Sequence, residues 1–368
     1  MGECCQEFKS GSFIPASDIG DVGKYPVYGG NGLRGFSSEY NHDGEFALIG
    51  RQGALCGNMN YSLGKAYFTE HAIAVQANKT ADTKFLYYLL RKMNLGQYSD
   101  QSAQPGLAVG KLVKLTELFP SVTEQIKIGH QFMGIDNLIT LHQRKLNQLK
   151  TLKKYFLQNM FPAKGEKVPR IRFKGFTGDW EQRKLGECAP IRGGFAFESK
   201  KFVNSGVPII RISNILGDGN VGGEFTYYDE QNNDSQYILP DKALIMAMSG
   251  ATTGKVGILN NPNNLKYYQN QRVGYFLPDD EYDYKFIGTF LRSNLFQNQL
   301  QEVLVSGAQP NISGNDINKF IINIPVSLAE QKQIGRIMNL FDKIVAIHQR
   351  KLDQLQTMKK FMLQNMFI

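Results

Sequence analysis

One feature limits the fold of this chain more than any other: a long segment of its sequence occurs twice. Residues 121–161 align without gaps on residues 327–367, at an offset of 206 positions, and 21 of the 41 aligned positions are identical. Both copies contain the pentapeptide His-Gln-Arg-Lys-Leu and both end in Leu-Gln-Asn-Met-Phe. A self-match of this length indicates an internal duplication, so the chain consists of two related halves.

Each copy predicts a long helix with a defined start. In the first copy Ser121 is followed three residues later by Glu124, which is the pattern of a capping box, and the second copy repeats it from Ser327. Apolar residues then recur at alternating spacings of three and four, which is the heptad seam of a helix that packs against another helix. The expected partner of each helix is the copy in the other half.

Polar residues interrupt the seam at matching places in the two copies, namely His142 and Lys153, and His348 and Lys359. Histidines on a seam could hold a metal, but polar residues that fix the register of two helices explain the pattern better. Gly129 and Gly335 are expected to kink the first turns and to divide each helix into two pieces.

The duplication continues, more weakly, outside the helices. Residues 2–4 match 186–188, residues 82–85 match 283–286, and a Ser…Gln-Pro pattern precedes each helix at residues 102–105 and 306–310. Short apolar runs between Gly and Asn turns predict strands at 46–49, 72–75, 243–246 and 320–324, and helices are predicted at 83–93 and 284–300. Asp82 and Asp283 are expected to cap these two helices.

These patterns divide the chain into five segments: a first domain at 1–120, a helix at 121–161, a linker at 162–182, a second domain at 183–326 and a helix at 327–368. Because residue 1 matches a point close to Leu185, the first domain is expected to lack an N-terminal arm. The predicted fold class is α+β, with two pseudo-twofold-related mixed α/β domains separated by two long antiparallel coiled-coil helices.

The composition favours a folded cytoplasmic protein with a polyanionic partner. The 42 Lys and Arg residues outnumber the 33 Asp and Glu residues, and the net charge of +9 suits the phosphates of a nucleic acid, although an ordinary basic protein has the same balance. The first ten residues lack the features of a signal peptide, and no apolar run approaches the roughly 18 residues that span a bilayer. The four cysteines show neither metal-ligand spacing nor a disulfide framework.

Several near matches to catalytic motifs each fail on a specific point. Residues 250–256, Gly-Ala-Thr-Thr-Gly-Lys-Val, have three residues between the glycines where a P-loop has four, and Val256 replaces the Mg²⁺-binding Ser or Thr. Asp279 with Asp283 and Lys285 resembles a nuclease metal site, but the spacing is too short and the first half has no counterpart of Asp279. We therefore predict a non-catalytic chain, whose glycine-rich turn could approach a DNA backbone closely.

The loops of both domains contain basic, amide and aromatic residues, which are candidates for contact with DNA. Arg reads guanine and Asn or Gln reads adenine through paired hydrogen bonds, whereas Lys, Ser and Thr suit phosphates. Each residue taken singly is compatible with a solvated loop, and it is the set that favours DNA contact. The predicted DNA-binding residues are Lys24, Tyr25, Tyr28, Asn31, Arg34, Arg51 and Gln52 in the first domain, and Arg192, Arg211, Asn214, Ser249, Thr252, Thr253, Lys255, Asn270 and Arg272 in the second.

The chain resembles the specificity subunit of type I restriction-modification systems, because two variable domains alternate with two similar helices. Both helices contain the pattern Glu-Gln…Ile-Gly…Asp…His-Gln-Arg-Lys-Leu…Leu-Gln-Asn-Met-Phe. The linker, from Val168 through Trp180 to Gly186, is similar to the segment that opens the target-recognition domains of that family. The resemblance covers essentially the whole chain.

The resemblance implies that each domain is a target-recognition domain that binds one half of a bipartite, asymmetric double-stranded DNA site, and that the helices set the gap. It also implies two docked modification (methyltransferase) subunits and restriction (translocase/endonuclease) subunits. S-adenosylmethionine, ATP and Mg²⁺ would belong to those partners, and no cofactor or metal to this chain. Two other classes stay open: a duplicated coiled-coil scaffold that binds proteins, and an enzyme fused to a helical dimeriser, which would need a catalytic cluster.

Overall fold

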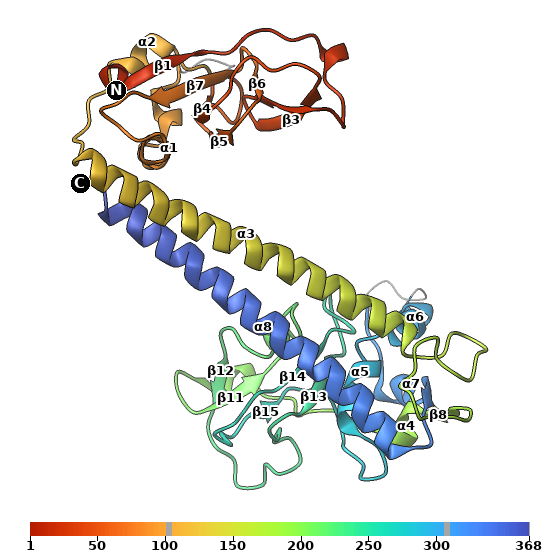
Figure 1. Ribbon diagram of the computed structural model, residues 1–368. Coiled ribbons are helices and arrows are strands. Elements are labelled where there is room, and N and C mark those ends of the chain that lie inside the picture. Colours follow the sequence, from red (N-terminus) through yellow and green to blue (C-terminus); the bar gives the residue numbers. More distant parts are fainter. Residues whose placement is uncertain (101–104, 305–309, 368) are drawn as a thin grey trace. The chain divides into compact units, whose positions relative to one another are not determined.

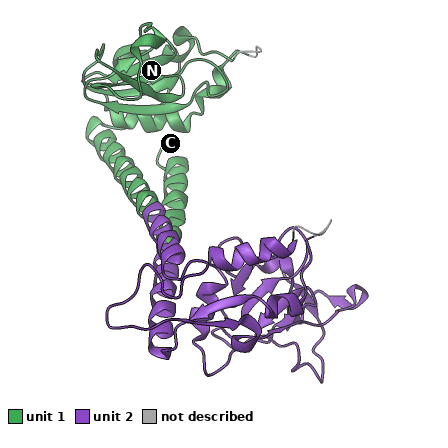
Figure 2. Cartoon of the chain, turned by 90° about the vertical axis from the view of Figure 1, so that its right-hand side faces the viewer, with its two compact units in different colours: residues 1–145, 348–368 green, residues 146–347 purple. Residues whose placement is uncertain are grey.

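The computed structural model describes residues 1–100, 105–304 and 310–367. The chain forms two compact units (Figure 2): unit 1 comprises residues 1–145 and 348–368, and unit 2 comprises residues 146–347. Four residues of the predicted Ser…Gln-Pro patterns lie outside the described residues, namely Ser102, Gln104, Ser306 and Gln309. Of the helices in the described ranges, none has the length and apolar character needed to cross a membrane.

The two repeated segments form the long helices α3 (Val122–Asn159) and α8 (Leu328–Asn365), each of which is unbroken (Figure 1). The predicted kinks at Gly129 and Gly335 are therefore wrong. Each glycine instead allows a close approach to the start of a shorter helix. A Cβ atom added to Gly129 would lie 2.7 Å from Asp82 Oδ1, and one added to Gly335 would lie 2.6 Å from Asp283 Oδ1.

The shorter helices are α1 (Thr83–Lys92) in unit 1 and α5 (Tyr284–Phe290) in unit 2, and both begin with the predicted aspartate cap. The Asp82 carboxylate accepts a hydrogen bond from the Phe85 N–H at 2.8 Å, and Asp283 accepts one from the Phe286 N–H at 2.8 Å. Each carboxylate satisfies a donor that the first turn of a helix leaves free, so the two predicted caps are confirmed.

A buried glutamine joins each long helix to the start of the short one. Gln125 of α3 accepts a hydrogen bond from the backbone N–H of Asp82 at 3.1 Å and donates one to the Pro120 carbonyl at 2.9 Å. Gln331 of α8 makes the two equivalent bonds in unit 2, each at 2.9 Å. The repeated sequence thus preserves one docking contact in two places.

The predicted capping boxes are only partly formed. Ser121 Oγ accepts a long hydrogen bond of 3.4 Å from the Glu124 N–H at the start of α3. The equivalent glutamate of α8, Glu330, is buried and pairs with the linker residue Arg172 through two bonds of 2.8 and 2.9 Å. In the second repeat the glutamate therefore ties the linker to α8, a long-range contact that a local sequence pattern does not reveal.

Within each unit α3 and α8 pack side by side. Polar pairs across their seam include Asp136–Lys359 and His142–His348 in unit 1, and Lys153–Asp342 in unit 2. Residue numbers rise along α3 as they fall along α8, so the helices are antiparallel. The two histidine Nδ1 atoms lie 3.0 Å apart. Burial lowers the pKa of Lys359, and the carboxylate of Asp136 opposes that shift.

Each repeat ends in the core of the domain that belongs to the other repeat. Phe367, which follows α8, lies in the core of unit 1, where its ring centroid is 5.4 Å from that of Phe85. Phe161, which follows α3, lies in the core of unit 2, and its ring is 5.4 Å from that of Phe286. Each unit is therefore assembled from parts of both repeats.

Unit 1 contains an antiparallel sheet with the strand order β1-β7-β4-β5. A second sheet has the order β3-β2-β6, in which β2 and β6 are parallel. The strands are β1 (Cys5–Ser10), β2 (Tyr25–Gly29), β3 (Gly32–Ser37), β4 (Glu45–Gly50), β5 (Met59–Leu63), β6 (Tyr67–Phe68) and β7 (Ala72–Ala77). The short helices are α2 (Val109–Val113), η1 (Gly2–Cys4), η2 (Ala16–Asp18) and η3 (Leu95–Tyr98).

Unit 2 repeats this plan with a sheet in the order β9-β16-β13-β14 and a second in the order β10-β12-β11-β15, in which β11 and β15 are parallel. A two-stranded sheet pairs β8 with β17. The strands are β8 (Glu181–Lys184), β9 (Ile191–Arg192), β10 (Phe202–Val203), β11 (Val207–Ile210), β12 (Thr226–Tyr228), β13 (Leu244–Ala247), β14 (Val256–Ile258), β15 (Tyr268–Gln269), β16 (Val273–Phe276) and β17 (Ile321–Ile324). The remaining helices are α4 (Leu185–Cys188), α6 (Asn294–Leu304), α7 (Gly314–Asn318), η4 (Ser199–Lys201) and η5 (Ile212–Asn214).

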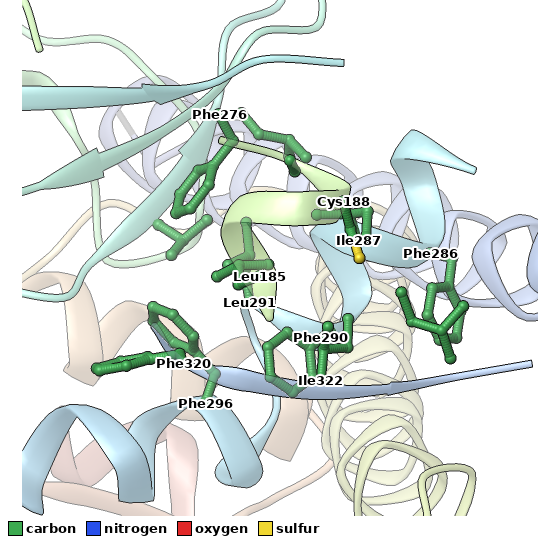
Figure 3. Packing of buried hydrophobic residues seen from close by; sticks show 14 of the residues in the cluster. Leu185, Cys188, Phe276, Phe286, Ile287, Phe290, Leu291, Phe296, Phe320 and Ile322 are labelled. Carbon is green, nitrogen blue, oxygen red and sulfur yellow. The ribbon is translucent and has the colours of Figure 1, made fainter. Parts of the chain in front are cut away.

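The core of unit 2 centres on α5. Its apolar side chains meet those of α4, α6, β16 and β17, and the residues shown in Figure 3 include Phe286, Ile287 and Phe290 of α5, Leu185 and Cys188 of α4, Phe296 of α6, Phe276 of β16 and Ile322 of β17. This packing includes β16, and the turn that leads into β16 lines the candidate site.

The predicted α+β class, with two mixed α/β domains and two long antiparallel helices, is confirmed. The strands predicted at 46–49, 72–75, 243–246 and 320–324 are present as β4, β7, β13 and β17. The helix predicted at 284–300 is divided into α5 and α6, because the chain leaves the helix at residues 291–293. All four cysteines are free thiols.

Candidate nucleic-acid interface

In unit 1 a polar hollow of about 420 Å³ lies where the ends of several strands meet. Its lining consists of residues 29–34, Gln52, Gly53 and His71. The hollow therefore brings together Asn31, Arg34 and Gln52, three of the seven residues predicted in this domain. The others lie outside its lining: Lys24 is exposed beside the ring of Tyr25, Tyr28 packs edge-on against Phe68, and Arg51 is half-buried.

In unit 2 a larger hollow of about 860 Å³ is lined by residues 191–193, 248–251, 271–272, Gly274 and 310–314. It brings together the predicted residues Arg192, Ser249 and Arg272. Six other predicted residues do not line it: Arg211, Asn214, Thr252, Thr253, Lys255 and Asn270. Lys255 is exposed at the far end of the glycine-rich turn that supplies Gly250 and Ala251.

The two hollows occupy equivalent places in the two domains. In each domain, three backbone hydrogen bonds of 2.8–3.0 Å hold the segment that follows a central strand, which is β4 in unit 1 and β13 in unit 2. One bond joins this segment to the turn before the neighbouring strand, β7 or β16. The other two join it to the Pro-containing segment that precedes the long helix. The matching pairs, with the N–H donor first, are Arg51–His71 and Met248–Arg272, Gly53–Pro105 and Gly250–Pro310, and Leu107–Arg51 and Ile312–Met248. Identical backbone bonds thus frame two hollows that differ in their side chains.

The turn after the central strand has the same glycines in both domains. Residues 53–57 read Gly-Ala-Leu-Cys-Gly and residues 250–254 read Gly-Ala-Thr-Thr-Gly. The first and last glycine have φ between +78° and +85° in both turns, a conformation that L side chains rarely adopt. The turn joins β13 to β14, so the P-loop-like residues 250–256 do not stand at the start of a helix, where a P-loop would bind phosphate.

Several predicted contact residues are already engaged within the domain. Asn214 is 1% exposed, and its amide bonds the N–H of Arg211 and the carbonyls of residues 222 and 224. The Arg192 guanidinium bonds Gln269 and the carbonyl of residue 238, and burial lowers its pKa. Thr253 Oγ1 donates within its own turn. These side chains shape the site, and the buried Asn214 is not part of its solvent-facing surface.

Other polar atoms at the site are buried and have no partner. Among the described residues five buried side-chain atoms lack a hydrogen bond, and one of them, Trp180 Nε1, belongs to the core of unit 2. The other four belong to segments that border the hollows: Glu70 Oε2 in unit 1, and Arg211 Nε, Ser249 Oγ and Thr252 Oγ1 in unit 2. An unsatisfied buried polar atom costs about 1–3 kcal/mol, so a polar ligand that satisfied these atoms would gain binding energy.

Sequence reasoning missed several residues that the fold brings to the site. Glu70 and His71 stand in the turn before β7, and Gln271, Asn311 and Ser313 line the hollow of unit 2. One signal could have found Gln271, since it lies between two predicted residues, Asn270 and Arg272. The other four come from segments that meet the site only through long-range strand pairing.

The described parts of the chain hold no group of three or more His, Cys, Asp or Glu residues that could bind a metal ion. The arrangement at both hollows is instead one of hydrogen-bonding side chains around open, solvent-facing concavities. Arginine, amide and hydroxyl groups in this setting are suited to recognising the edges of bases and the oxygens of phosphates.

Comparison with known proteins gives a consistent picture. Residues 2–151 and 177–357 match the family described as "Type I restriction modification DNA specificity domain". The chain is 49% identical over 119 residues to the type I restriction enzyme EcoprrI specificity subunit of Escherichia coli, a match that covers 32% of this chain and 30% of that relative. It is 27% identical over 299 residues to the type I restriction enzyme MjaVIII specificity subunit of Methanocaldococcus jannaschii, covering 77% of this chain and 69% of that protein.

The fold also matches a solved structure. The S subunit of a type I restriction-modification system from M. genitalium superimposes with a TM-score of 0.74, at 16% identity, over 98% of this chain and 93% of that chain. That likeness extends to nearly the whole of both chains, and the family match covers both repeats. The chain therefore belongs to the type I restriction-modification DNA specificity domain family.

Proposed function

We propose that this chain is the DNA-reading subunit of a type I restriction-modification complex, in which each domain contacts one half of a bipartite, asymmetric double-stranded DNA site. One observation carries the proposal: the two domains place hollows of different polar lining on the same backbone frame. A repeated frame with unequal side chains is what a reader of two unequal half-sites requires. Base edges differ in their donor and acceptor patterns, so different linings select different bases.

The charge of the chain supports the same partner. A net charge of +9 favours a polyanion. The exposed Arg34 and Arg272 line the two hollows, and the exposed Lys255 follows the glycine-rich turn that borders the second. Contacts of this kind release counterions from DNA, so the affinity is expected to fall steeply as salt is raised. The unpartnered Ser249 and Thr252 hydroxyls are suited to phosphate oxygens in the same way.

We further propose that the chain is non-catalytic and docks two modification subunits and the restriction subunits of the complex. S-adenosylmethionine, ATP and Mg²⁺ would be bound by those partners. The helices offer apolar surface for docking, because large apolar side chains remain exposed on them, including Leu138, Leu141, Leu152, Leu340, Ile347 and Phe361. The four free thiols fit a reducing compartment, so the proposed location of the complex is the cytoplasm.

The test is to reconstitute the full chain with a modification subunit and to map methylated adenines in a library of duplexes. The expected result is methylation at a split motif with two different halves. Assembly of the complex without methylation at any split motif would contradict the proposal. A protein-binding scaffold, the main alternative, predicts complexes whose DNA affinity does not depend on salt, so a salt titration of duplex binding separates the two functions.

A further inference from the structure

The turns that lead into β7 and β16 are equivalent in backbone and different in chemistry. In unit 1 Thr69 Oγ1 accepts a hydrogen bond from the His71 N–H at 3.3 Å, and in unit 2 Asn270 Oδ1 accepts one from the Arg272 N–H at 3.2 Å. The Thr69 and Asn270 N–H groups also donate to the neighbouring parallel strand, at 2.9 Å to the Tyr28 carbonyl of β2 and at 3.1 Å to the Ile210 carbonyl of β11. Each turn is therefore clamped by its first residue, and the two residues that follow are presented to solvent.

Those two presented residues are Glu70 and His71 in unit 1, and Gln271 and Arg272 in unit 2. Gln271 and Arg272 are exposed, and the described part of the chain gives neither side chain a hydrogen-bond partner. Glu70 and His71 are about one third and two fifths exposed and touch each other at 3.2 Å, while the second carboxylate oxygen of Glu70 lacks a partner. His71, Gln271 and Arg272 line their hollows.

The two dipeptides suit different sets of base edges. Arginine pairs with the O6 and N7 acceptors of guanine and glutamine with the N6 and N7 groups of adenine, whereas a carboxylate accepts from the N4 amino group of cytosine. A histidine ring N–H can donate to a purine acceptor. Glu70 carries the same negative charge as the phosphates, so near DNA its carboxylate suits a base amino group better than the backbone.

We propose that these dipeptides determine base identity at one or two adjacent, equivalent positions of each half-site, with Gln271 selecting an adenine and Arg272 an adjacent guanine, and with Glu70-His71 selecting a cytosine with its paired guanine. This inference rests on the proposed function and adds to it which residues distinguish the two half-sites. The clamping residues Thr69 and Asn270 are positioning residues, because their side chains hold the turn and the next two residues meet the base.

The experiment exchanges the dipeptides in the full chain reconstituted with modification subunits. One variant carries Gln271→Glu with Arg272→His, the other carries Glu70→Gln with His71→Arg, and bound duplexes are selected from a random library and sequenced. Each variant is expected to change one or two adjacent base pairs in one half-site and to leave the other half-site unchanged. Arg272→Ala alone is expected to reduce discrimination at its position by roughly 10- to 100-fold.

Arg183→Ala is the matched control, because it removes one exposed arginine of unit 2 from β8, outside the hollow. It is expected to leave the selected motif unchanged. If both exchange variants select the wild-type motif with wild-type discrimination, the dipeptide inference is wrong and the proposed function stands. If the wild-type complex selects no split motif at all, the proposed function fails and the inference fails with it. Circular dichroism of each variant establishes that the exchanged turns have not unfolded the domain.

Discussion

Unit 1 and unit 2 share the contacts that hold them together and differ in the side chains that face solvent at their hollows. The aspartate caps, the buried glutamines and the close approach of a glycine to a helix start recur in both units. At the hollows, by contrast, Gln52 stands where Ser249 stands, and His71 where Arg272 stands. The repeated residues stabilise the fold, and the residues that differ are free to determine what each unit binds.

The comparison also shows that the two units depend on each other's sequence. The last residues of α3 and α8 are nearly identical, and each set completes the core of the domain encoded by the other repeat. A substitution at the end of α8 should therefore weaken unit 1, and a substitution at the end of α3 should weaken unit 2.

The largest expected effect concerns the helix ends that complete the core of the other repeat's domain. Phe367→Ala should lower the free energy of unfolding of unit 1 by about 3–4 kcal/mol, because it leaves a cavity beside Phe85 and Phe132. Phe161→Ala should do the same to unit 2, beside Phe286. Hydrogen exchange of β7 and β16 amides in denaturant measures the two units separately. Faster exchange of β16 after the Phe367 substitution, with β7 unchanged, would contradict the assignment of each side chain to its unit.

The sequence predicted the parts of this fold that depend on local patterns. Capping aspartates, the heptad seam and the short apolar strands are specified by residues a few positions apart, so they could be recognised without the structure. The contact of Gly129 with Asp82 could not, since a glycine near the start of a predicted helix suggested only a kink. The pairing of Arg172 with Glu330 was also hidden, because 158 residues of sequence separate the two side chains.

The candidate site was predictable in composition and not in geometry. Asn31, Arg34 and Gln52 were singled out as polar loop residues, and strand pairing gathers them around one hollow. Asn214 matched the same description, yet its amide is consumed by the backbone of its own loop. Whether an amide faces solvent or its own chain depends on the path of residues eight to ten positions away, which composition does not specify.

A smaller effect is expected from the glycine that lets α3 dock. Gly129→Ala should destabilise unit 1 by about 1–2 kcal/mol, because the new Cβ would lie within 2.9 Å of three atoms of the α1 start, a strain only partly offset by about 1 kcal/mol of helix propensity. Gly134→Ala is the control in the same helix, since nothing lies within 4 Å of its Cβ position, and it should stabilise by about 0.5–1 kcal/mol. Urea denaturation followed by hydrogen exchange measures both. Equal stabilisation by the two substitutions would show that the close approach is absent.

The units should also differ in their response to acid. In unit 2 Tyr268 donates to Asp234, and Lys266, at 2.9 Å, holds the pKa of that carboxyl below its usual 3.8. The equivalent Tyr67 of unit 1 donates to the carbonyl of residue 13, which does not titrate. Because the folded pKa is depressed, this stabilisation is complete above about pH 3.8 and is lost as the pH falls through the folded value.

Asp234→Asn should therefore remove about 1 kcal/mol of stability from unit 2 at neutral pH and flatten its acid profile below pH 4, with no change in unit 1. Unfolding midpoints between pH 2 and pH 7, read from β15 and β6 amides, test this. An acid profile of the Asn variant that runs parallel to that of the wild type would exclude Asp234 as the titrating group.

The smallest expected change concerns the salt dependence of DNA binding. Lys255 and Asn58 are equivalent, since their carbonyls accept from the N–H groups of Ala247 and Gly50 at 2.9 and 2.8 Å, and both are exposed. If Lys255 contacts a phosphate, Lys255→Ala should reduce the slope of log affinity against log salt by about 0.9, and Asn58→Lys should increase it by about the same amount. Neither should alter the selected bases, because a phosphate contact reads no sequence. Fluorescence anisotropy of the reconstituted complex on one duplex, between about 50 and 200 mM salt, measures both slopes. An unchanged slope in the Lys255 variant would place this lysine away from the DNA backbone. The difference between the units in DNA binding would then rest on the hollows alone.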